Sequence, residues 1–440
     1  MTQASVGVPV TPADVGQKAI DCGTVVVDGV TYYRQRVETY HADDHHIDAF
    51  GRLRVSNPTL IFESQFIYNL LPLLYEPITA GVGASIAHDA TNRHAVMTFA
   101  STPTSGKAYM QTFAYHRYQP GKSQSIAISF NFIEQVANCL KFAGYSDGVN
   151  GIEFQNNGVT NRFVIYSGTS NGNQIANQAD WNLDKLDGTG RSGITLDISK
   201  RQIVVIDFQA LNSGRVRCGF DIGGTKVYCH EFNHANIATV SFVQNPNCPI
   251  RAGMTCTGTV STTMHYNRCS VISEGGQEKS STGLEFASDF AVVAGNGVRT
   301  HAISIRPRAL FNGITNRHGI TFLEIDLLVT GNYPVEWELC LGQAISGTTT
   351  FADVNTTWSS MEKNTAGTIS GAPAIIIDES YVAASNQSTG QSSMDFTFRY
   401  PITLDAAGVA RLPGTLTIVL TGIGGVSQCY GAVKWTEHRG

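Results

Sequence analysis

Two histidines four positions apart have the spacing that most directly suggests chemistry. His230-Glu231-Phe232-Asn233-His234 matches H-E-x-x-H, in which two histidines bind zinc and the glutamate acts as a base. The motif needs a helix, because only there do residues i and i+4 share a face. Val227-Tyr228-Cys229 instead favours a strand, on which the two histidines would lie about 13 Å apart at ~3.3 Å per residue. The sequence therefore favours a strand over a zinc protease site.

An acidic loop from Asp180 to Gly188 partly matches a calcium-binding loop. Asp180, Asn182 and Asp184 follow the opening D-x-[DN]-x-[DN] of such loops. Lys185 then replaces the required glycine, and Arg191 stands where a bidentate glutamate belongs. The match to a calcium loop is therefore incomplete.

The same loop holds the local candidate for glycan binding. Trp181 could offer an aromatic platform, with Asp184 and Asp187 as hydrogen-bonding acids. The favoured interpretation needs no ligand, because the acids would cap turns and Trp181 would fill the edge of a core. A glycan or calcium site at Trp181, Asp184 and Asp187 is kept as the alternative.

Three glycine-containing stretches match enzyme motifs in letters but not in context. Asp221 to Lys226, DIGGTK, looks like the phosphate hairpin of actin-like sugar kinases, yet β-type sequence follows it. Gly121-Lys122-Ser123 ends like a P-loop, but the sequence after it alternates like a strand, whereas a P-loop opens a helix. Gly168 to Gly172, GTSNG, matches G-x-S-x-G without a helix after it. We expect turns and loops at all three.

Two further sets of polar residues carry weak signals. Glu153 and Asp207 are eligible by type as the two carboxylates of a glycosidase, as are most acidic pairs. The segment His41 to Asp48 is dense in metal-ligand types, but a solvated linker explains it more simply. No convincing nucleophile, base and orienting group can be assigned, so we expect no enzyme activity, no metal and no cofactor.

Composition excludes several classes of function. The chain has 440 residues, 15% charged, with a net charge of −5, whereas a nucleic-acid footprint needs a basic surface. The nine cysteines are scattered and form no C-x-x-C pair, which favours buried free thiols and folding in a reducing compartment. The N-terminus lacks the pattern of a signal peptide, and no apolar run approaches the ~20 residues of a membrane span.

Alternation of apolar and polar residues predicts an all-β chain. In Arg215 to Phe232, Val216, Cys218, Phe220 and Ile222 define one apolar face, the other face is wetter, and Gly223-Gly224 suits a tight hairpin turn. The run Ile203 to Ile206 predicts a strand buried on both faces. A single hairpin is unstable in water, so a second sheet must cover it.

The expected architecture is a concanavalin-like jelly-roll sandwich followed by a second, C-terminal β-sandwich domain. We place an N-terminal arm at residues 1–50, the jelly roll at 51–270 and the C-terminal domain at 283–440, with a linker beginning near Ser270. The arm includes a possible strand pair. Further strands are predicted at Thr24–Val27, Val30–Tyr33, Ile152–Phe154, Phe163–Tyr166, Ala302–Ile305, Thr321–Val329, Val335–Leu341, Ala374–Ile377, Phe396–Phe398, Leu416–Leu420 and Ala432–Trp435.

Several motifs in order resemble a group of virion-associated proteins of tailed bacteriophages. They are Asp48–Pro58 (DAFGRLRVSNP), Tyr118–Gln124 (YQPGKSQ), Asp180–Asp197 (beginning DWNLDKLDGTG), Ile206–Phe208 with Gly214–Phe220 (GRVRCGF), and the trailer His230–Asn236. The resemblance covers about residues 48–255. It implies a virion context and names no catalytic residue.

This resemblance implies a non-enzymatic structural protein of the virion, made in the host cytoplasm. We expect it to associate with itself, plausibly as a trimer, and to pack on other virion proteins, with head decoration or a fibre slightly preferred over neck or tail. The alternative is an adhesin for host surface glycans, and a polysaccharide hydrolase is less favoured. Neither a nucleic acid nor a membrane is an expected partner.

Overall fold

The computed structural model describes residues 22–27, 30–35, 48–50, 57–102, 105–276, 283–384, 389–393 and 401–438. Contacts divide the chain into residues 1–44 and 45–440. In the first unit, β1 (Cys22–Val27) pairs antiparallel with β2 (Val30–Gln35), which confirms the predicted strand pair. His41 to His46 lie outside the described residues.

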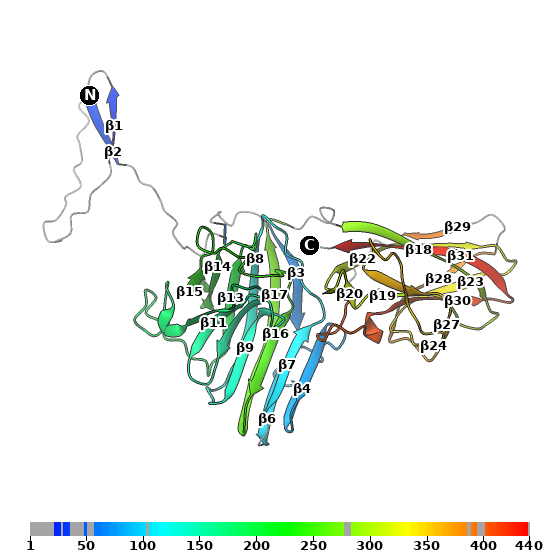
Figure 1. Cartoon of the computed structure of the whole chain (residues 1–440), viewed down its shortest axis with the longest axis horizontal. Helices are drawn as coiled ribbons and strands as arrows, with labels where there is room; N and C mark the ends of the chain where they lie inside the picture. Colours follow the sequence, from blue (N-terminus) through cyan, green and yellow to red (C-terminus); the bar gives the residue numbers. More distant parts are fainter. Residues whose placement is uncertain are drawn as a thin grey trace. The chain divides into compact units, whose positions relative to one another are not determined.

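Two antiparallel sheets form the first β-sandwich of residues 45–440 (Figure 1). The seven-stranded sheet has the order β12 (Gln174–Asn177), β11 (Asn161–Tyr166), β10 (Gly151–Asn156), β9 (Cys139–Ser146), β16 (Ile250–Cys256), β7 (Gly106–Thr112), β4 (Tyr75–Ala80). The eight-stranded sheet has the order β15 (Thr225–Phe232), β14 (Val216–Ile222), β13 (Gln202–Phe208), β8 (Ser123–Asn131), β17 (Val260–Glu274), β6 (His94–Thr102), β5 (Ala84–Asp89), with β3 (Pro58–Gln65) paired to β17.

The predicted hairpin of Arg215 to Phe232 is present as β14 and β15. Gly223 and Gly224 make the turn at φ values of 63° and 83°, in the left-handed region that glycine tolerates. Val216, Cys218 and Phe220 point into the core and are all 0% exposed. The expectation of a wetter second face is wrong at its centre, where Arg217 is also 0% exposed. The hairpin is therefore covered on both sides there.

Aromatic rings from both sheets fill the core of the first sandwich. The Phe154 ring of β10 lies 5.0 Å from that of Phe220 in β14 and 5.6 Å from that of Phe132, which follows β8. Each is fully buried, and burying one such side chain contributes about 1.5–3 kcal/mol. In β13, Val204 to Ile206 are buried as predicted, but Ile203 is 39% exposed. The continuous apolar run of β13 is therefore buried except at its first residue.

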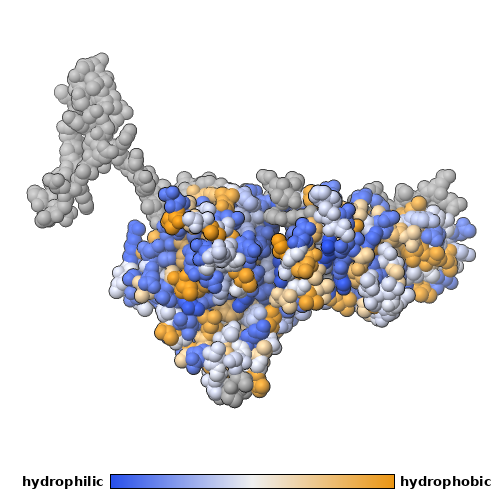
Figure 2. All heavy atoms as spheres, in the orientation of Figure 1, coloured by the Kyte–Doolittle hydropathy of each residue, from blue (hydrophilic) through white to orange (hydrophobic). Residues whose placement is uncertain are grey.

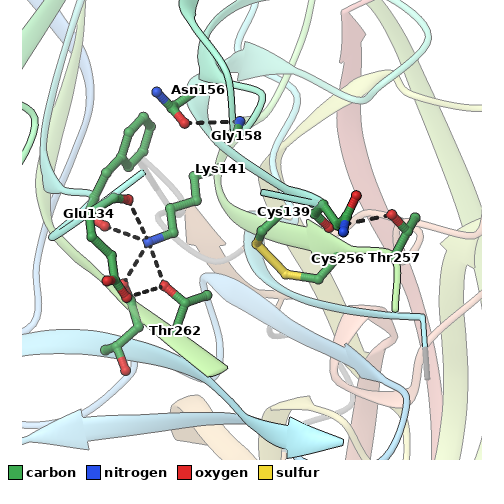
Figure 3. The surroundings of a disulfide bond; sticks show 11 residues. Glu134, Cys139, Lys141, Asn156, Gly158, Cys256, Thr257 and Thr262 are labelled. Atoms are coloured by element: carbon green, nitrogen blue, oxygen red, sulfur yellow. Dashed lines mark hydrogen bonds between the residues drawn. A yellow bond between two sulfur atoms is a disulfide. The ribbon is translucent and has the colours of Figure 1, made fainter. Parts of the chain in front are cut away.

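A buried lysine ties the two sheets together (Figure 3). Lys141 of β9 is 0% exposed, and its ammonium donates to Thr262 Oγ1 at 2.8 Å and to Thr263 O at 3.1 Å, both in β17 of the other sheet. It also donates to the carbonyl oxygens of Phe132 (2.6 Å) and Glu134 (3.0 Å). Four oxygen acceptors thus surround one buried charge, which satisfies it within the fold.

Cys139 and Cys256 form a disulfide bond between β9 and β16 (Figure 3). The scattered cysteines had predicted no pair, because spacing along the chain carries no information about strand register. The two residues face each other in the β9–β16 pairing, although 117 positions separate them in sequence. The expectation of buried free thiols is confirmed for Cys218, Cys229, Cys248, Cys269, Cys340 and Cys429.

Two further sheets form a second sandwich between residues 283 and 438. The four-stranded sheet has the order β18 (Gly283–Ala294), β31 (Ser427–His438), β22 (Gly319–Val329), β29 (Thr389–Ser393). The six-stranded sheet has the order β25 (Ala352–Asp353), β26 (Met361–Asn364), β19 (Thr300–Pro307), β30 (Leu416–Gly422), β23 (Val335–Leu341), β28 (Ile375–Val382). Two small two-stranded sheets are formed by β20 (Leu310–Phe311) with β21 (Ile314–Thr315) and by β24 (Ile345–Gly347) with β27 (Gly367–Ile369).

The second sandwich has its own hydrophobic core, built around Trp337, Trp435 and Phe290. The predicted strands of this part are confirmed, except that Phe396 to Phe398 lie outside the described residues. The linker expected from Ser270 is strand as far as Glu274, because β17 continues there against β3 and β8. The boundaries 1–50, 51–270 and 283–440 remain a prediction.

The described residues form an all-β structure with two β-sandwiches, as predicted. Their helical segments are two short 3₁₀ turns, Gln178–Asp180 and Leu412–Gly414. None of the helices in this described part is long or apolar enough to cross a membrane. On the face drawn in Figure 2, hydrophobic areas are interspersed among hydrophilic ones.

Candidate functional site

Trp181, the alternative candidate for a sugar platform, lies in the core of the first sandwich, as the favoured interpretation of its loop predicted. Its side chain is 2% exposed and packs on the Phe163 ring at 4.9 Å. The indole Nε1 donates to Ala176 O at 3.1 Å. Because the ring is buried and its N–H is hydrogen-bonded to the backbone, no surface of Trp181 is free to contact a sugar. Trp181 therefore fills the edge of the core.

The two acids of the same loop bind their own backbone. Asp184 is 5% exposed; its Oδ1 accepts from Leu186 N at 2.9 Å and its Oδ2 from Ser192 N at 2.7 Å. Asp187 Oδ1 accepts from the amide and the hydroxyl of Thr189, and these bonds lower the pKa of Asp187. The structure does not bring Trp181, Asp184 and Asp187 to a common surface, so a glycan or calcium site there gains no support from geometry.

The H-E-x-x-H histidines also have structural partners. His230 is in β15 and lies against the Phe232 ring, with centroids 4.4 Å apart. His234 Nδ1 is 2.6 Å from Gly214 O, and its ring stacks on Phe242 at 4.2 Å. Burial lowers the pKa of His230 to about 4. The motif begins on strand β15, as predicted, and continues just past its end. Its two histidine rings pack against different phenylalanines.

The three enzyme-like glycine stretches are turns and loops. Lys122 Nζ donates to Gly276 O at 3.1 Å, and Ser123 begins a strand instead of a helix. Asp221 Oδ1 accepts from Gly224 N at 3.1 Å, which closes the hairpin turn. Ser170 is exposed in a turn between β11 and β12. None of these stretches has the strand–helix geometry that its motif needs.

Glu153 and Asp207 lie on opposite outer faces of the first sandwich. In β10, Ile152 and Phe154 point into the core, so Glu153 points out of the seven-stranded sheet. In β13, Val204, Ile206 and Phe208 point inward, so Asp207 points out of the eight-stranded sheet. Packed sheets are about 10 Å apart before side chains are counted, whereas glycosidase carboxylates lie about 5–9.5 Å apart. These two acids therefore cannot act as a pair.

Glu153 nonetheless belongs to a buried polar cluster that the sequence alone did not reveal. It is 0% exposed, and its Oε2 accepts from Gln155 Nε2 at 2.8 Å. Its Oε1 lies 3.8 Å from Arg251 Nε of β16, without a hydrogen-bond partner in the described structure. Gln155 Nε2 also donates to Tyr166 OH at 2.9 Å. Burial, reinforced by the Glu153 charge, raises the pKa of Tyr166.

Aromatic rings cover the arginine of this cluster. The Arg251 guanidinium carbon lies 4.7 Å from the centroid of the Tyr109 ring and 4.6 Å from that of Phe142. Gly144 is opposite Glu153, and a Cβ at Gly144 would lie 2.3 Å from Ile152 O and 2.7 Å from Glu153 Cγ, so only glycine fits against β10 here. Period-two alternation could have placed these residues on the outer face. Their meeting depends on pairing between distant strands.

A second ion pair is buried on the other outer face. Arg217 Nη2 lies 3.5 Å from Asp207 Oδ2, which also accepts from Tyr228 OH. The Arg217 guanidinium lies 4.2 Å from the centre of the Tyr228 ring. Both charged residues are 0% exposed. Each outer face thus uses its candidate acid in an arginine–aromatic clasp, an arrangement suited to holding strands together.

No metal site can be assembled from the described ranges: they contain no group of three or more His, Cys, Asp or Glu residues placed to hold an ion. His94 and His265 lie side by side, with ring centroids 4.3 Å apart, and His94 Nε2 is 3.7 Å from Asp89 Oδ2. Burial lowers the pKa of both histidines.

Comparison with known proteins gives likenesses of fold. No protein-family model and no curated protein matches the chain. Among solved structures, an endo-1,3-beta-glucanase from Streptomyces sioyaensis is 10% identical, with a TM-score of 0.36, over 50% of this chain and 97% of that one. A glycosyl hydrolase family 16 protein from Mycobacterium smegmatis is 14% identical, with a TM-score of 0.32, over 48% and 100%. A carbohydrate esterase from the Shiga toxin-encoding bacteriophage phi24B is 12% identical, with a TM-score of 0.29, over 49% and 99%.

Proposed function

We propose that this chain is a non-enzymatic structural component of a tailed-bacteriophage virion. It associates with copies of itself, with a trimer as the expected state, and packs on neighbouring capsid or tail subunits. Head decoration or a fibre is slightly preferred as its position. The protein is made in the host cytoplasm and resides in the particle.

The observation that carries this proposal is the structural use of residues in the phage-like motifs. Tyr118 is 2% exposed, and its hydroxyl donates to Lys122 O at 2.7 Å, which closes the second motif on itself. Asp184 in the third motif caps its own loop through Leu186 N and Ser192 N. Tyr118 and Asp184, which belong to the motifs that carry the resemblance, therefore stabilise their own loops. This is expected of a structural protein.

The start of the first motif is fastened to the eight-stranded sheet. Asp48 and Ala49 are 4% and 2% exposed. Ala49 N donates to Ser123 Oγ at 3.3 Å, and Ala49 O accepts from Arg215 Nε at 3.3 Å. Asp48 and Ala49 are thereby fixed on the sandwich, which suits the proposed N-terminal arm, residues 1–50, that reaches a neighbouring subunit.

The alternative, a host-glycan adhesin, loses its predicted platform because Trp181 is buried. A polysaccharide hydrolase would need a second carboxylate near Glu153, and Asp207 lies on the opposite face of the sandwich. The structural role is therefore preferred over both.

Counting copies on purified particles tests the proposal. Quantitative mass spectrometry should find this chain at a stoichiometric copy number, in a fixed ratio to the major capsid protein, after density-gradient purification. Its presence in infected-cell lysate alone would overturn the virion role. Light scattering on the isolated full chain tests self-association, for which a trimer mass is expected and a monomer at all concentrations contradicts it.

A further inference from the structure

Trp358 is presented to solvent on the second sandwich. Its side chain is 63% exposed, whereas Trp181, Trp337 and Trp435 are 2%, 3% and 0% exposed. Tryptophan is highly buried on average. The position of Trp358 is also not at a free end, because it lies in the short connection between β25 and β26.

The turn that carries Trp358 is fixed by hydrogen bonds between its backbone and the side chains of Asn355 and Arg308. Asn355 Oδ1 accepts from Thr357 N at 3.0 Å and from Trp358 N at 2.8 Å. The Arg308 guanidinium donates to Thr356 O and to Ser359 O, both at 3.2 Å. The backbone around the exposed ring is therefore held in one conformation.

The two residues after Trp358 anchor the turn in the interior. Ser359 and Ser360 are both 0% exposed, and their hydroxyls donate to the buried carboxylate of Glu437 at 2.6 and 2.7 Å. Burial alone would raise the pKa of Glu437, but the hydrogen bonds from Ser359, Ser360 and Trp435 outweigh it and lower that pKa. A rigid anchor of this kind reduces the ordering cost of binding at the ring.

We propose that the Trp358 turn is a glycan-binding platform. The C–H face of an uncharged pyranose ring can stack on the indole, which has a large apolar face and one N–H donor. Hydroxyl groups of the sugar need nearby polar partners. Thr356 and Thr357 are exposed on the same turn, and Arg308 pairs with Asp353 at 3.0 Å at its base. An exposed indole beside exposed hydroxyl groups can hold a sugar by stacking and by hydrogen bonding.

The β20–β21 hairpin next to the Trp358 turn exposes apolar side chains. Leu310 and Ile314 are 54% and 72% exposed on the β20–β21 hairpin. Asn316 Nδ2, just after that hairpin, donates to Ser360 O at 2.8 Å and so ties it to the Trp358 turn. The residues beside Trp358 itself are polar, which favours a saccharide over a protein at the indole.

The test uses the full chain on an array of bacterial capsular polysaccharides and lipopolysaccharide O-chains. Wild type should bind at least one glycan, Trp358→Ala should weaken that binding at least tenfold, and Trp358→Phe should retain most of it. The matched control, Leu310→Ala with Ile314→Ala, should bind like wild type. Because Trp358 is largely exposed, its variants should keep the circular dichroism spectrum of the parent.

Two results would overturn the platform: no binding on the array, and binding that Trp358→Ala leaves unchanged. If the array is negative and Trp358→Ala also loses self-association, the turn belongs to a protein interface instead. The copy number on particles does not depend on Trp358, so failure here is distinguishable from failure of the virion proposal.

Discussion

Lys141 and Thr262 belong to opposite sheets of the first sandwich, and Lys141 Nζ lies 2.8 Å from Thr262 Oγ1. The same ammonium binds Phe132 O, Glu134 O and Thr263 O. The turn that supplies two of these oxygens contains Ile133 at φ 67°, an unfavourable conformation for a β-branched residue. The lysine thus holds a strained turn and the neighbouring sheet at once.

Replacing Lys141 with methionine should destabilise the fold. The substitution removes four hydrogen bonds from the Lys141 ammonium to oxygen atoms, and a hydrogen bond to a charged group contributes about 1.5–3 kcal/mol. Removing the buried charge offsets part of this, so we expect a loss of about 3 kcal/mol in the free energy of unfolding. Urea denaturation measures it. Lys185→Met, at an exposed position, is the control and should leave the free energy of unfolding nearly unchanged. Equal stability of the two variants would show that Lys141 does not stabilise the contact between the sheets.

The Cys139–Cys256 bond should stabilise the oxidised protein. It closes a loop of 117 positions, for which the chain-entropy account gives about 4–5 kcal/mol. Unfolding free energies with and without reductant should differ by several kcal/mol in wild type and not in the Cys139→Ala, Cys256→Ala double variant. Cys218→Ala, which removes a buried free thiol, should retain the reductant effect. A wild-type protein insensitive to reductant would exclude a stabilising bond.

Residue patterns within short segments predicted the strands. They could not predict which distant strands pair with one another. Gly223-Gly224 and the alternation around Phe220 report neighbours within one hairpin, and these expectations are confirmed. The contact of Arg251 with Glu153 depends on β16 and β10 each pairing with β9. No feature within either segment encodes that register. The same holds for Cys139 opposite Cys256, which only the fold brings together.

The candidate site shows the same division. Trp181 has the residue type of a sugar platform, and the sequence favoured the other interpretation, in which the ring fills the edge of a core. The structure places it in the core and leaves Trp358 exposed. Composition of a loop thus identified candidate chemistry, but burial, which decides whether a side chain can meet a ligand, follows from packing against distant residues.

Acid should destabilise the protein through His116. Burial lowers the pKa of His116 to about 3, whereas an unfolded histidine titrates near 6.5. Below pH ~6.5 the unfolded chain therefore binds a proton that the folded protein does not. The stabilisation is complete above pH ~6.5 and is lost progressively as pH falls toward 3, at up to about 1.4 kcal/mol per pH unit for this residue.

A His116→Gln variant isolates this contribution. Free energies of unfolding of wild type and variant, measured from pH 8 to 4, should run parallel above pH ~6.5 and converge below it, because only wild type loses the His116 contribution. His230, His265 and His301, whose burial lowers each pKa to about 4, remain in both proteins and supply the common slope. Curves that stay parallel down to pH 4 would show that His116 is not kept neutral by the fold.

The Glu153–Arg251 pair should respond unequally to loss of its two members. Arg251→Met leaves a carboxylate that is 0% exposed without its cation, and breaking a buried pair in this way costs about 3–5 kcal/mol. It also removes the stacking on Tyr109 and Phe142. Glu153→Gln leaves a neutral amide beside Gln155 and an arginine that retains 14% exposure, so its cost should be about 1–2 kcal/mol.

The double variant shows whether Glu153 and Arg251 stabilise the fold through each other or independently. If the arginine mainly neutralises the buried acid, Glu153→Gln with Arg251→Met should be more stable than Arg251→Met alone, with a coupling energy of about 1–3 kcal/mol in urea denaturation. Additive losses would mean that the arginine acts through its aromatic neighbours instead. Since Arg251 comes from β16 and Glu153 from β10, a positive coupling would also measure how far the outer face, and not only the core, holds the seven-stranded sheet in register.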